Sequence, residues 1–327
     1  MNSYERVRRA IEFQKPDRLP VMFDALGRSD FHHVKWNQIG VGDKNLSTSL
    51  DEWGCSWMRS SINNMGQVKG HPLADHHLIA QYRWPDADDP AFYQGMEDRF
   101  KGSEGKFITT GIFMLLFERM HSLLGFENTL GGLYMERAWL EEVADRIVEF
   151  DLRIIANIAQ RFPGQIHGLN FTDDWGTQQR LMIRPAMWND FFKPRYKRIF
   201  DAAHQAGWHV WMHSCGKVNA ILEDLIDIGA DVIELQQPTV LGIEAVGEQF
   251  RGRICFASLC DIQHTLPYKS DEEIRAEAEL LLKHWSAPEG GFILIDYGDG
   301  GAIGVSIEKK RVMLDAFVNA DPWSQAI

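Results

Sequence analysis

The chain has 327 residues, of which 45% are hydrophobic, and this composition is typical of a globular protein rather than a disordered one. Its 34 basic and 46 acidic residues give a net charge of −12, which disfavours nucleic acid as a partner. An anionic substrate would therefore need a locally positive pocket. Four cysteines are too few for a disulfide framework. Since the N-terminal residues lack the apolar core of a signal peptide and no apolar run could span a bilayer, we expect a cytoplasmic protein with no membrane partner.

The N-terminal third of the sequence is the least regular. Residues 4–13 predict a short helix, and residues 18–23 predict a first strand. Residues 27–105 are rich in Trp, His, Asp and Gly and carry turn signals instead of a steady period. We therefore expect this stretch to be an elaboration within a single domain that spans residues 1–327.

From residue 107 onward, short apolar runs alternate with amphipathic helical patterns. The predicted strands are residues 107–113, 165–171, 208–213, 231–235, 254–259 and 292–295. The predicted helices are residues 139–159, 185–205, 218–228, 243–250, 271–285 and 306–318. Five strands lie beyond residue 164, and the N-terminal part can supply about three more.

Eight strand–helix units in a chain of this length predict an α/β fold of the (β/α)8 TIM barrel type. The alternative is a doubly wound sheet. No Gly-x-Gly-x-x-Gly motif follows the first strand, and its absence argues against a dinucleotide-binding fold.

The catalytic residues of such a barrel lie just beyond the carboxyl ends of its strands. Asp173 and Asp174 follow the strand predicted at residues 165–171, and two adjacent carboxylates there can donate or accept a proton. The alternative interpretation is that one of them caps the following turn.

His213 and Cys215 follow the strand predicted at residues 208–213. Because side chains alternate along an extended segment, residues two apart point the same way, and imidazole with thiolate suits Zn²⁺. A catalytic zinc takes three protein ligands, so Cys260 or Asp299 would complete the set. The alternative is a buried thiol beside a core histidine.

Three residues near other strand ends are candidates for binding substrate. Arg28 lies shortly after the first strand, Gln236 follows the strand at residues 231–235, and Tyr297 follows the last strand. Asp299, in the glycine-rich segment after that strand, could also take a proton.

Seven short motifs spread over nearly the whole chain carry a family resemblance. They are YERV at residues 4–7, PDRLPV at 16–21, DEWGC at 51–55, GHPL at 70–73, DDWGTQ at 173–178, MHSCG at 212–216 and DIQ at 261–263. With these motifs the chain resembles the uroporphyrinogen decarboxylase superfamily and, within it, the zinc-dependent methyltransferase-like branch.

The resemblance implies a barrel whose pocket lies at the carboxyl-end mouth. Its methyltransferase branch uses a His-x-Cys pair, which His213 and Cys215 match, and a cysteine after the last strand, where this chain has Asp299. It implies an enzyme that moves a methyl group between a small substrate and a corrinoid protein or thiol. Zinc would be the cofactor, a separate corrinoid-carrying protein would be a partner, and a homodimer is common among such barrels.

Two alternatives follow from the same resemblance. The true decarboxylases hold substrate carboxylates with an Arg-Gln-Ala-Gly-Arg segment, of which this chain keeps Gly27 and Arg28. The first alternative is thus a metal-independent decarboxylase of a porphyrinogen or a smaller acid, with Arg28 binding a carboxylate. The second alternative is a non-catalytic module that binds a tetrapyrrole or a corrinoid.

Overall fold

In the computed structural model, which describes residues 1–38, 48–58 and 66–324, one sheet of nine strands forms the centre of the molecule. Its strands are β1 Val21–Phe23, β2 Arg28–Ser29, β3 Phe31–His33, β7 Phe107–Ile112, β8 Gly168–Thr172, β9 His209–His213, β10 Val232–Leu235, β11 Cys255–Ser258 and β12 Phe292–Ile295. They lie in the order β2-β1-β12-β11-β10-β9-β8-β7-β3. All of their ladders are parallel except that of β1 with β2.

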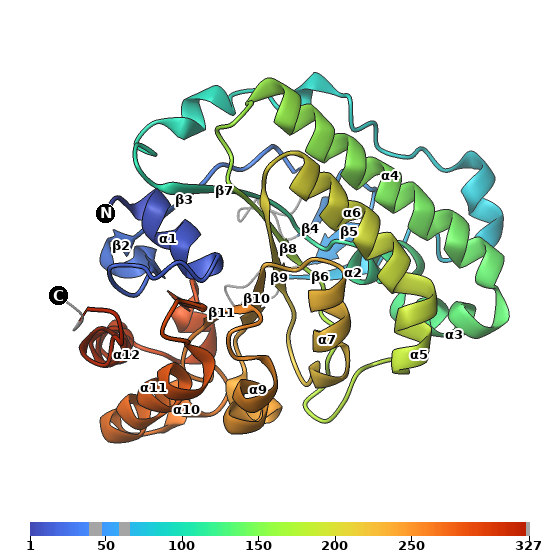
Figure 1. Cartoon of the computed structure of the whole chain (residues 1–327). Helices are drawn as coiled ribbons and strands as arrows, with labels where there is room; N and C mark the ends of the chain where they lie inside the picture. Colours follow the sequence, from blue (N-terminus) through green and yellow to red (C-terminus); the bar gives the residue numbers. More distant parts are fainter. Residues whose placement is uncertain (39–47, 59–65, 325–327) are drawn as a thin grey trace.

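Helices surround this sheet (Figure 1). They are α1 Ser3–Ile11, α2 Phe117–Leu124, α3 Phe126–Met135, α4 Arg137–Arg161, α5 Pro185–Met187, α6 Lys193–Gln205, α7 Asn219–Asp227, α8 Pro238–Leu241, α9 Ile243–Phe250, α10 Thr265–Tyr268, α11 Asp271–Trp285 and α12 Ile307–Asn319. Helix α11 packs between α9 and α12, and α4 packs along α6. Among the described residues, no helix is both long and apolar enough to cross a membrane.

The two ends of the sheet meet at Asp30. Its N–H donates to the carbonyl of Val21 in β1 at 2.7 Å, and its carbonyl accepts from the N–H of Phe107 in β7 at 2.9 Å. This backbone bridge curls the sheet into a nearly closed barrel. The predicted TIM-barrel fold is confirmed.

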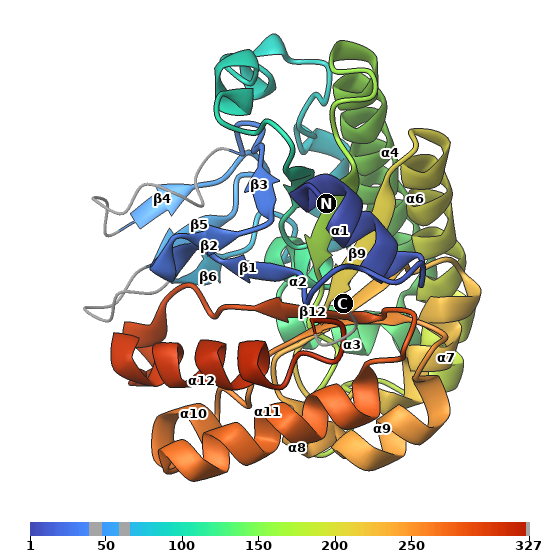
Figure 2. The same cartoon turned by 60° about the vertical axis from the view of Figure 1, so that its left-hand side comes forward.

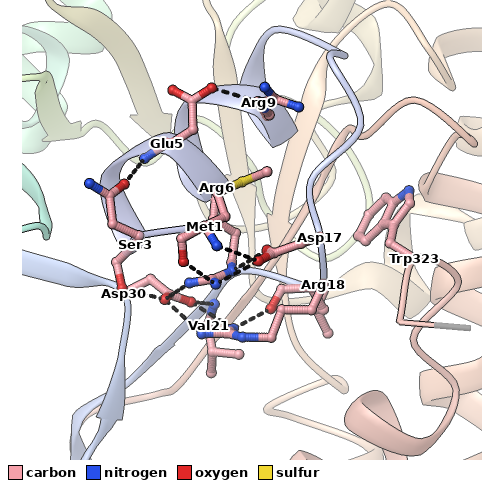
Figure 3. A network of polar contacts seen from close by, with 12 residues as sticks. Met1, Ser3, Glu5, Arg6, Arg9, Asp17, Arg18, Val21, Asp30 and Trp323 are labelled. Atoms are coloured by element: carbon pink, nitrogen blue, oxygen red, sulfur yellow. Dashed lines mark hydrogen bonds and ion pairs between the residues drawn. The ribbon is translucent and has the colours of Figure 1, made fainter. Parts of the chain in front are cut away.

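The side chain of Asp30 also ties the start of the chain to the barrel (Figure 3). Its Oδ1 accepts hydrogen bonds from Ser3 Oγ at 2.7 Å and from Arg6 at 2.9 Å, and Arg18 donates to both of its oxygens. Arg6 also pairs with Asp17. A buried carboxylate is tolerated when it is paired and hydrogen-bonded in this way.

The elaboration predicted at residues 27–105 contains a second sheet, which projects from one side of the barrel (Figure 2). Its antiparallel strands are β4 Thr48–Leu50, β5 Ser56–Met58 and β6 Gln67–Gly70. Asp51, next to β4, accepts hydrogen bonds from Trp57 at 3.0 Å and from the buried Arg119 of α2 at 2.8 Å. The elaboration is thereby joined to the barrel by a buried ion pair.

The strands and helices predicted beyond residue 164 are confirmed in position and type. One difference is that residues 185–205 are not a single α-helix, because a π-helical segment at Trp188–Phe192 separates α5 from α6. The sequence analysis also missed α2 and α3, which lie between β7 and α4.

Candidate metal centre and cavity at the strand ends

His213 and Cys215 face one another at the end of β9. The Sγ atom of Cys215 lies 3.4 Å from Nε2 of His213. Asp174, beyond the end of β8, accepts a hydrogen bond from the N–H of Cys215 at 2.8 Å, and its Oδ1 lies 3.6 Å from the same Nε2. One ligand atom from each of the three residues lies within 4.8 Å of the other two.

The register of two parallel strands explains this meeting. Thr172 of β8 pairs with His213 of β9, so Asp174 and Cys215 each stand two residues beyond a paired position. The two loops then cross closely at Gly176 and Gly216, and Gly176 N–H donates to the carbonyl of Cys215 at 3.1 Å. The crossing fixes the thiol beside the carboxylate.

The charges around His213 favour its protonated form when no cation is bound. Its Nδ1 lies 3.2 Å from Oε1 of Glu234 in β10. Burial alone would lower the pKa of His213, but the contacts with Cys215 and Glu234 outweigh it and raise that pKa well above the usual value. Burial also raises the pKa of the Cys215 thiol, although His213 opposes the shift.

The side chains of Asp174, His213 and Cys215 fit a zinc ion. Imidazole nitrogen, thiolate sulfur and carboxylate oxygen are all ligands that zinc accepts, and three protein ligands leave one position open. Glu234 lies beside the Nδ1 atom of His213, where a carboxylate commonly orients a histidine that binds a metal through its other nitrogen. The excess of acidic groups over cations at this point is what a divalent cation would neutralise.

A cavity of about 420 Å³ opens beside His213 and Glu234. Its walls include four aromatic residues, Trp36, Phe113, Phe171 and Trp211. Its polar lining residues include Lys35, Asn170 and Thr172. A mostly apolar cavity with a few convergent polar groups is typical of a small-molecule site.

Glu118, near the start of α2, is a candidate that the sequence analysis missed. Thr172 donates to its Oε2 at 3.2 Å. Burial and the nearby carboxylates Asp174 and Asp173 raise the pKa of Glu118 to about 8, so it holds a proton at neutral pH. No local motif distinguishes this glutamate, and the fold alone brings it to the strand ends.

Asp173 has a structural role in this arrangement. Its oxygens accept hydrogen bonds from the N–H groups of Leu116, Phe117 and Glu118 at the start of α2, and from the hydroxyl of Tyr196. A buried carboxylate at a helix N-terminus satisfies orphan donors and the helix dipole. Asp173 therefore caps a helix that lies earlier in the chain, not the following turn that the alternative interpretation named. Asp174 belongs to the cluster with His213 and Cys215.

The structure corrects the expected third zinc ligand. Cys260 is buried, and its thiol donates to the carbonyl of Ile274 in α11, away from His213. Asp299 accepts a hydrogen bond from the N–H of Ala302 and caps a short 3-10 helix. Among the described residues, neither belongs to the cluster that contains His213 and Cys215.

The predicted substrate-binding residues divide into two groups. Gln236 donates to Oε1 of Glu234 at 2.8 Å, and Tyr297 is half-buried within electrostatic reach of Cys215. Arg28, in contrast, is exposed and lines a separate hollow of about 230 Å³ together with Arg18. The expectation that Arg28 binds a carboxylate in the main cavity is therefore not supported by its position.

A second group with metal-ligand atoms lies on the surface, at Asp75, His76 and His77. All three side chains are exposed, and Asp75 already caps the short 3-10 helix that starts at His76. Exposed residues of this kind occur often without a metal.

Residues 108–319 match the family model of uroporphyrinogen decarboxylase (URO-D). None of the curated proteins matches the chain in sequence. The matched range includes β7 through β12 except for the first residue of β7, and it contains Asp174, His213 and Cys215.

Among solved structures, the chain is similar to a methyltransferase from Methanosarcina mazei, with 15% identity, 97% of this chain and 98% of that chain covered, and a TM-score of 0.68. Xylanase 10B from Thermotoga maritima is more distant, with 11% identity, 92% and 89% covered, and a TM-score of 0.40. At these identities the likeness to the methyltransferase supports the barrel fold and no particular reaction.

Proposed function

The chain belongs to the uroporphyrinogen decarboxylase family, and from that premise we propose that it is a zinc-dependent methyltransferase or demethylase. In this proposal Asp174, His213 and Cys215 hold the metal. A small substrate occupies the adjoining cavity, and a methyl group moves between that substrate and a corrinoid protein or a thiol. The observation that carries the proposal is the clustering of the three ligand atoms beside the cavity.

The residues around the cluster have separate tasks. Glu234 orients the His213 ring from the Nδ1 side, and Gln236 holds Glu234 in turn. Glu118, protonated at neutral pH, can supply a proton close to the strand ends. When bound, zinc would act as a Lewis acid that stabilises an alkoxide or thiolate. The aromatic walls of the cavity exclude water from the substrate.

The decarboxylase alternative has less support because Arg28 lies outside the main cavity. No other arginine lines that cavity among the described residues. An acid with several carboxylates would also meet Asp174 and Glu234 near the same strand ends.

The test of the proposal combines metal analysis with transfer. The purified protein should contain about one zinc per chain. It should also demethylate methylcobalamin in the presence of mercaptoethanol, which is followed by visible absorbance. Cys215→Ser and Asp174→Ala should lose both properties. The double variant His76→Ala/His77→Ala, which removes the exposed ligand group, should keep both.

Two results would contradict the proposal. One is a folded wild-type protein with substoichiometric zinc after growth in zinc-supplied medium. The other is a folded Cys215→Ser variant that retains the zinc content of the wild type. Zinc binding without methyl transfer would support the metal site but would contradict the proposed transfer reaction.

A further inference from the structure

A second cavity, of about 540 Å³, lies at the rim of the barrel and is called the rim cavity here. Three segments line it: residues 179–185 after β8, Lys217 with Asn219 and Ala220 at the start of α7, and Tyr134 at the end of α3. Figure 1 shows α3, α5 and α7 at the same end of the molecule. The rim cavity shares no lining residue with the cavity beside His213.

The charges of the rim cavity are all of one sign. Arg180, Arg184 and Lys217 line it, and no aspartate or glutamate does. All three cations are exposed, and none forms an ion pair with another described residue. In a chain with a net charge of −12, this hollow concentrates positive potential where the surface as a whole repels anions.

The start of α7 adds donors to the same wall. Asn219 and Ala220 line the cavity, and they are the first residues of a nine-residue helix. No side chain caps this helix, because the residue before it is Val218. Its first-turn N–H groups therefore lack side-chain acceptors, and they carry the positive end of the helix dipole.

Apart from Gln179, the remaining wall is mostly apolar. Leu181 and Ile183 line it, and Tyr134 beside them is 58% exposed although it is a large aromatic side chain. A bare inorganic ion would leave this wall uncovered. An anion attached to a flat or apolar body would cover it.

The rim cavity lies behind the loop that carries Cys215. Lys217, which lines it, donates its N–H to the carbonyl of Thr177 at 2.8 Å, where the two loops cross. The crossing is so tight that a Cβ at Gly176 would lie 2.5 Å from the nitrogen of Lys217. The loop that carries Cys215 thus also supplies Lys217 to the lining of the rim cavity.

From these observations we propose that the rim cavity is a binding site for an organic phosphate with an apolar or aromatic body. Arg180, Arg184 and Lys217 pair with the phosphate, the start of α7 donates to it, and Tyr134 with Leu181 contacts the body. Three cations and a helix N-terminus match a doubly charged phosphate better than a singly charged carboxylate. The site does not depend on the presence of zinc.

The test is calorimetric titration of the full-length protein with phenyl phosphate, inorganic phosphate and benzoate at constant ionic strength. We expect saturable binding of phenyl phosphate that is about tenfold or more tighter than that of either other probe. Arg180→Ala/Arg184→Ala should weaken phenyl phosphate binding about tenfold or more. The control Lys197→Ala/Arg198→Ala removes the same charge from exposed positions on α6 and should leave binding unchanged.

Each contrary outcome overturns the proposal in a defined way. Absence of saturable binding of phenyl phosphate at millimolar concentration removes the site. If both double variants lose the same affinity for phenyl phosphate, the loss is a long-range effect of net charge and not of the cavity. Preference for benzoate assigns the cavity to a carboxylate instead. Because the titration is repeated after zinc has been chelated, a failure of the metal-site proposal leaves its result interpretable.

Discussion

The Nδ1 atom of His213 lies 3.2 Å from Oε1 of Glu234, on the opposite side of the imidazole ring from Cys215. The two residues stand side by side in the register of β9 and β10. A carboxylate in this place fixes the ring so that its other nitrogen can bind a metal. The contact thus joins the sheet register to the proposed zinc chemistry.

Replacing this carboxylate tests that link. We expect Glu234→Gln to weaken zinc binding about 10- to 100-fold, because the ring loses the carboxylate charge 3.2 Å from its Nδ1, which orients the ring and increases its basicity. Competition with a chromophoric chelator measures the affinity. The control Glu223→Gln removes an exposed carboxylate that pairs with Arg253, and it should bind zinc as the wild type does. Equal affinities for the two variants would show that Glu234 does not support the metal.

The strands and helices beyond residue 164 could be predicted because their signals are local. The strand at Phe292–Ile295 is apolar throughout and buried, and the helix at Asp271–Trp285 begins with a capping box between Ser270 and Glu273. In contrast, α2 and α3 are short helices of eight and ten residues that meet at Gly125, and a glycine ordinarily marks the end of a helix.

The candidate site could be predicted only in part. The spacing of His213 and Cys215 was sufficient to place both side chains on one side of an extended segment, and the structure confirms this. Asp174 enters the cluster because Thr172 pairs with His213, and the register between two strands cannot be deduced from a single sequence. The expectation that Cys260 is a zinc ligand fails for a related reason. Its side chain turns toward α11 just beyond the end of β11, and this direction cannot be read from the sequence.

Asp30 should be among the most important polar residues for stability. Asp30→Asn keeps the backbone bridge that closes the sheet but leaves the buried Arg6 without one of its carboxylate partners, so we expect a loss of about 3 kcal/mol in the free energy of unfolding. Urea denaturation followed by circular dichroism measures it. Asp98→Asn, at an exposed ion pair with Lys101, should change stability by less than about 0.5 kcal/mol.

The same carboxylate predicts an acid sensitivity. Burial alone would raise the pKa of Asp30, but hydrogen bonds from Arg18 and Ser3 hold it below the ordinary value of 3.8. The contribution of Asp30 to the free energy of unfolding is therefore complete at pH values above 3.8 and is lost as the pH falls below 3.8. A difference in unfolding free energy between wild type and Asp30→Asn that does not shrink in this acid range would contradict the prediction.

Glu52 should have the opposite dependence on pH. Burial raises the pKa of Glu52 to about 7 although the nearby Arg119 opposes the shift, so the folded protein retains a proton that the unfolded chain releases near the ordinary pKa of 4.5. Stability should consequently fall as the pH rises between these two values. Glu52→Gln removes this loss. We expect the free energy of unfolding of the variant to be about 3 kcal/mol higher than that of the wild type above pH ~8.

Urea denaturation of Glu52→Gln across the pH range checks this expectation. Glu244→Gln, at an exposed position on α9, is the matched control and should keep the pH profile of the wild type. A parallel profile for wild type and Glu52→Gln would mean that Glu52 is ionised in the folded protein.

The close crossing of the two loops at Gly216 should affect both the stability of the protein and its zinc binding. Gly216 has a φ of +78°, and a Cβ there would lie 2.2 Å from the carbonyl oxygen of Gly176. Gly216→Ala must therefore push the loops apart and move Cys215 away from Asp174. We expect it to lose zinc and to lower the free energy of unfolding by about 2 kcal/mol or more.

The matched control for this variant is Gly298→Ala, because a Cβ at Gly298 meets no atom within 4 Å. That variant should keep both its zinc and its stability. If Gly216→Ala unfolds like the wild type and binds zinc with the same affinity, the loops tolerate separation at their crossing. Cys215 would then be positioned by the end of β9 alone, and the contact between its N–H and Asp174 would not be needed to form the site.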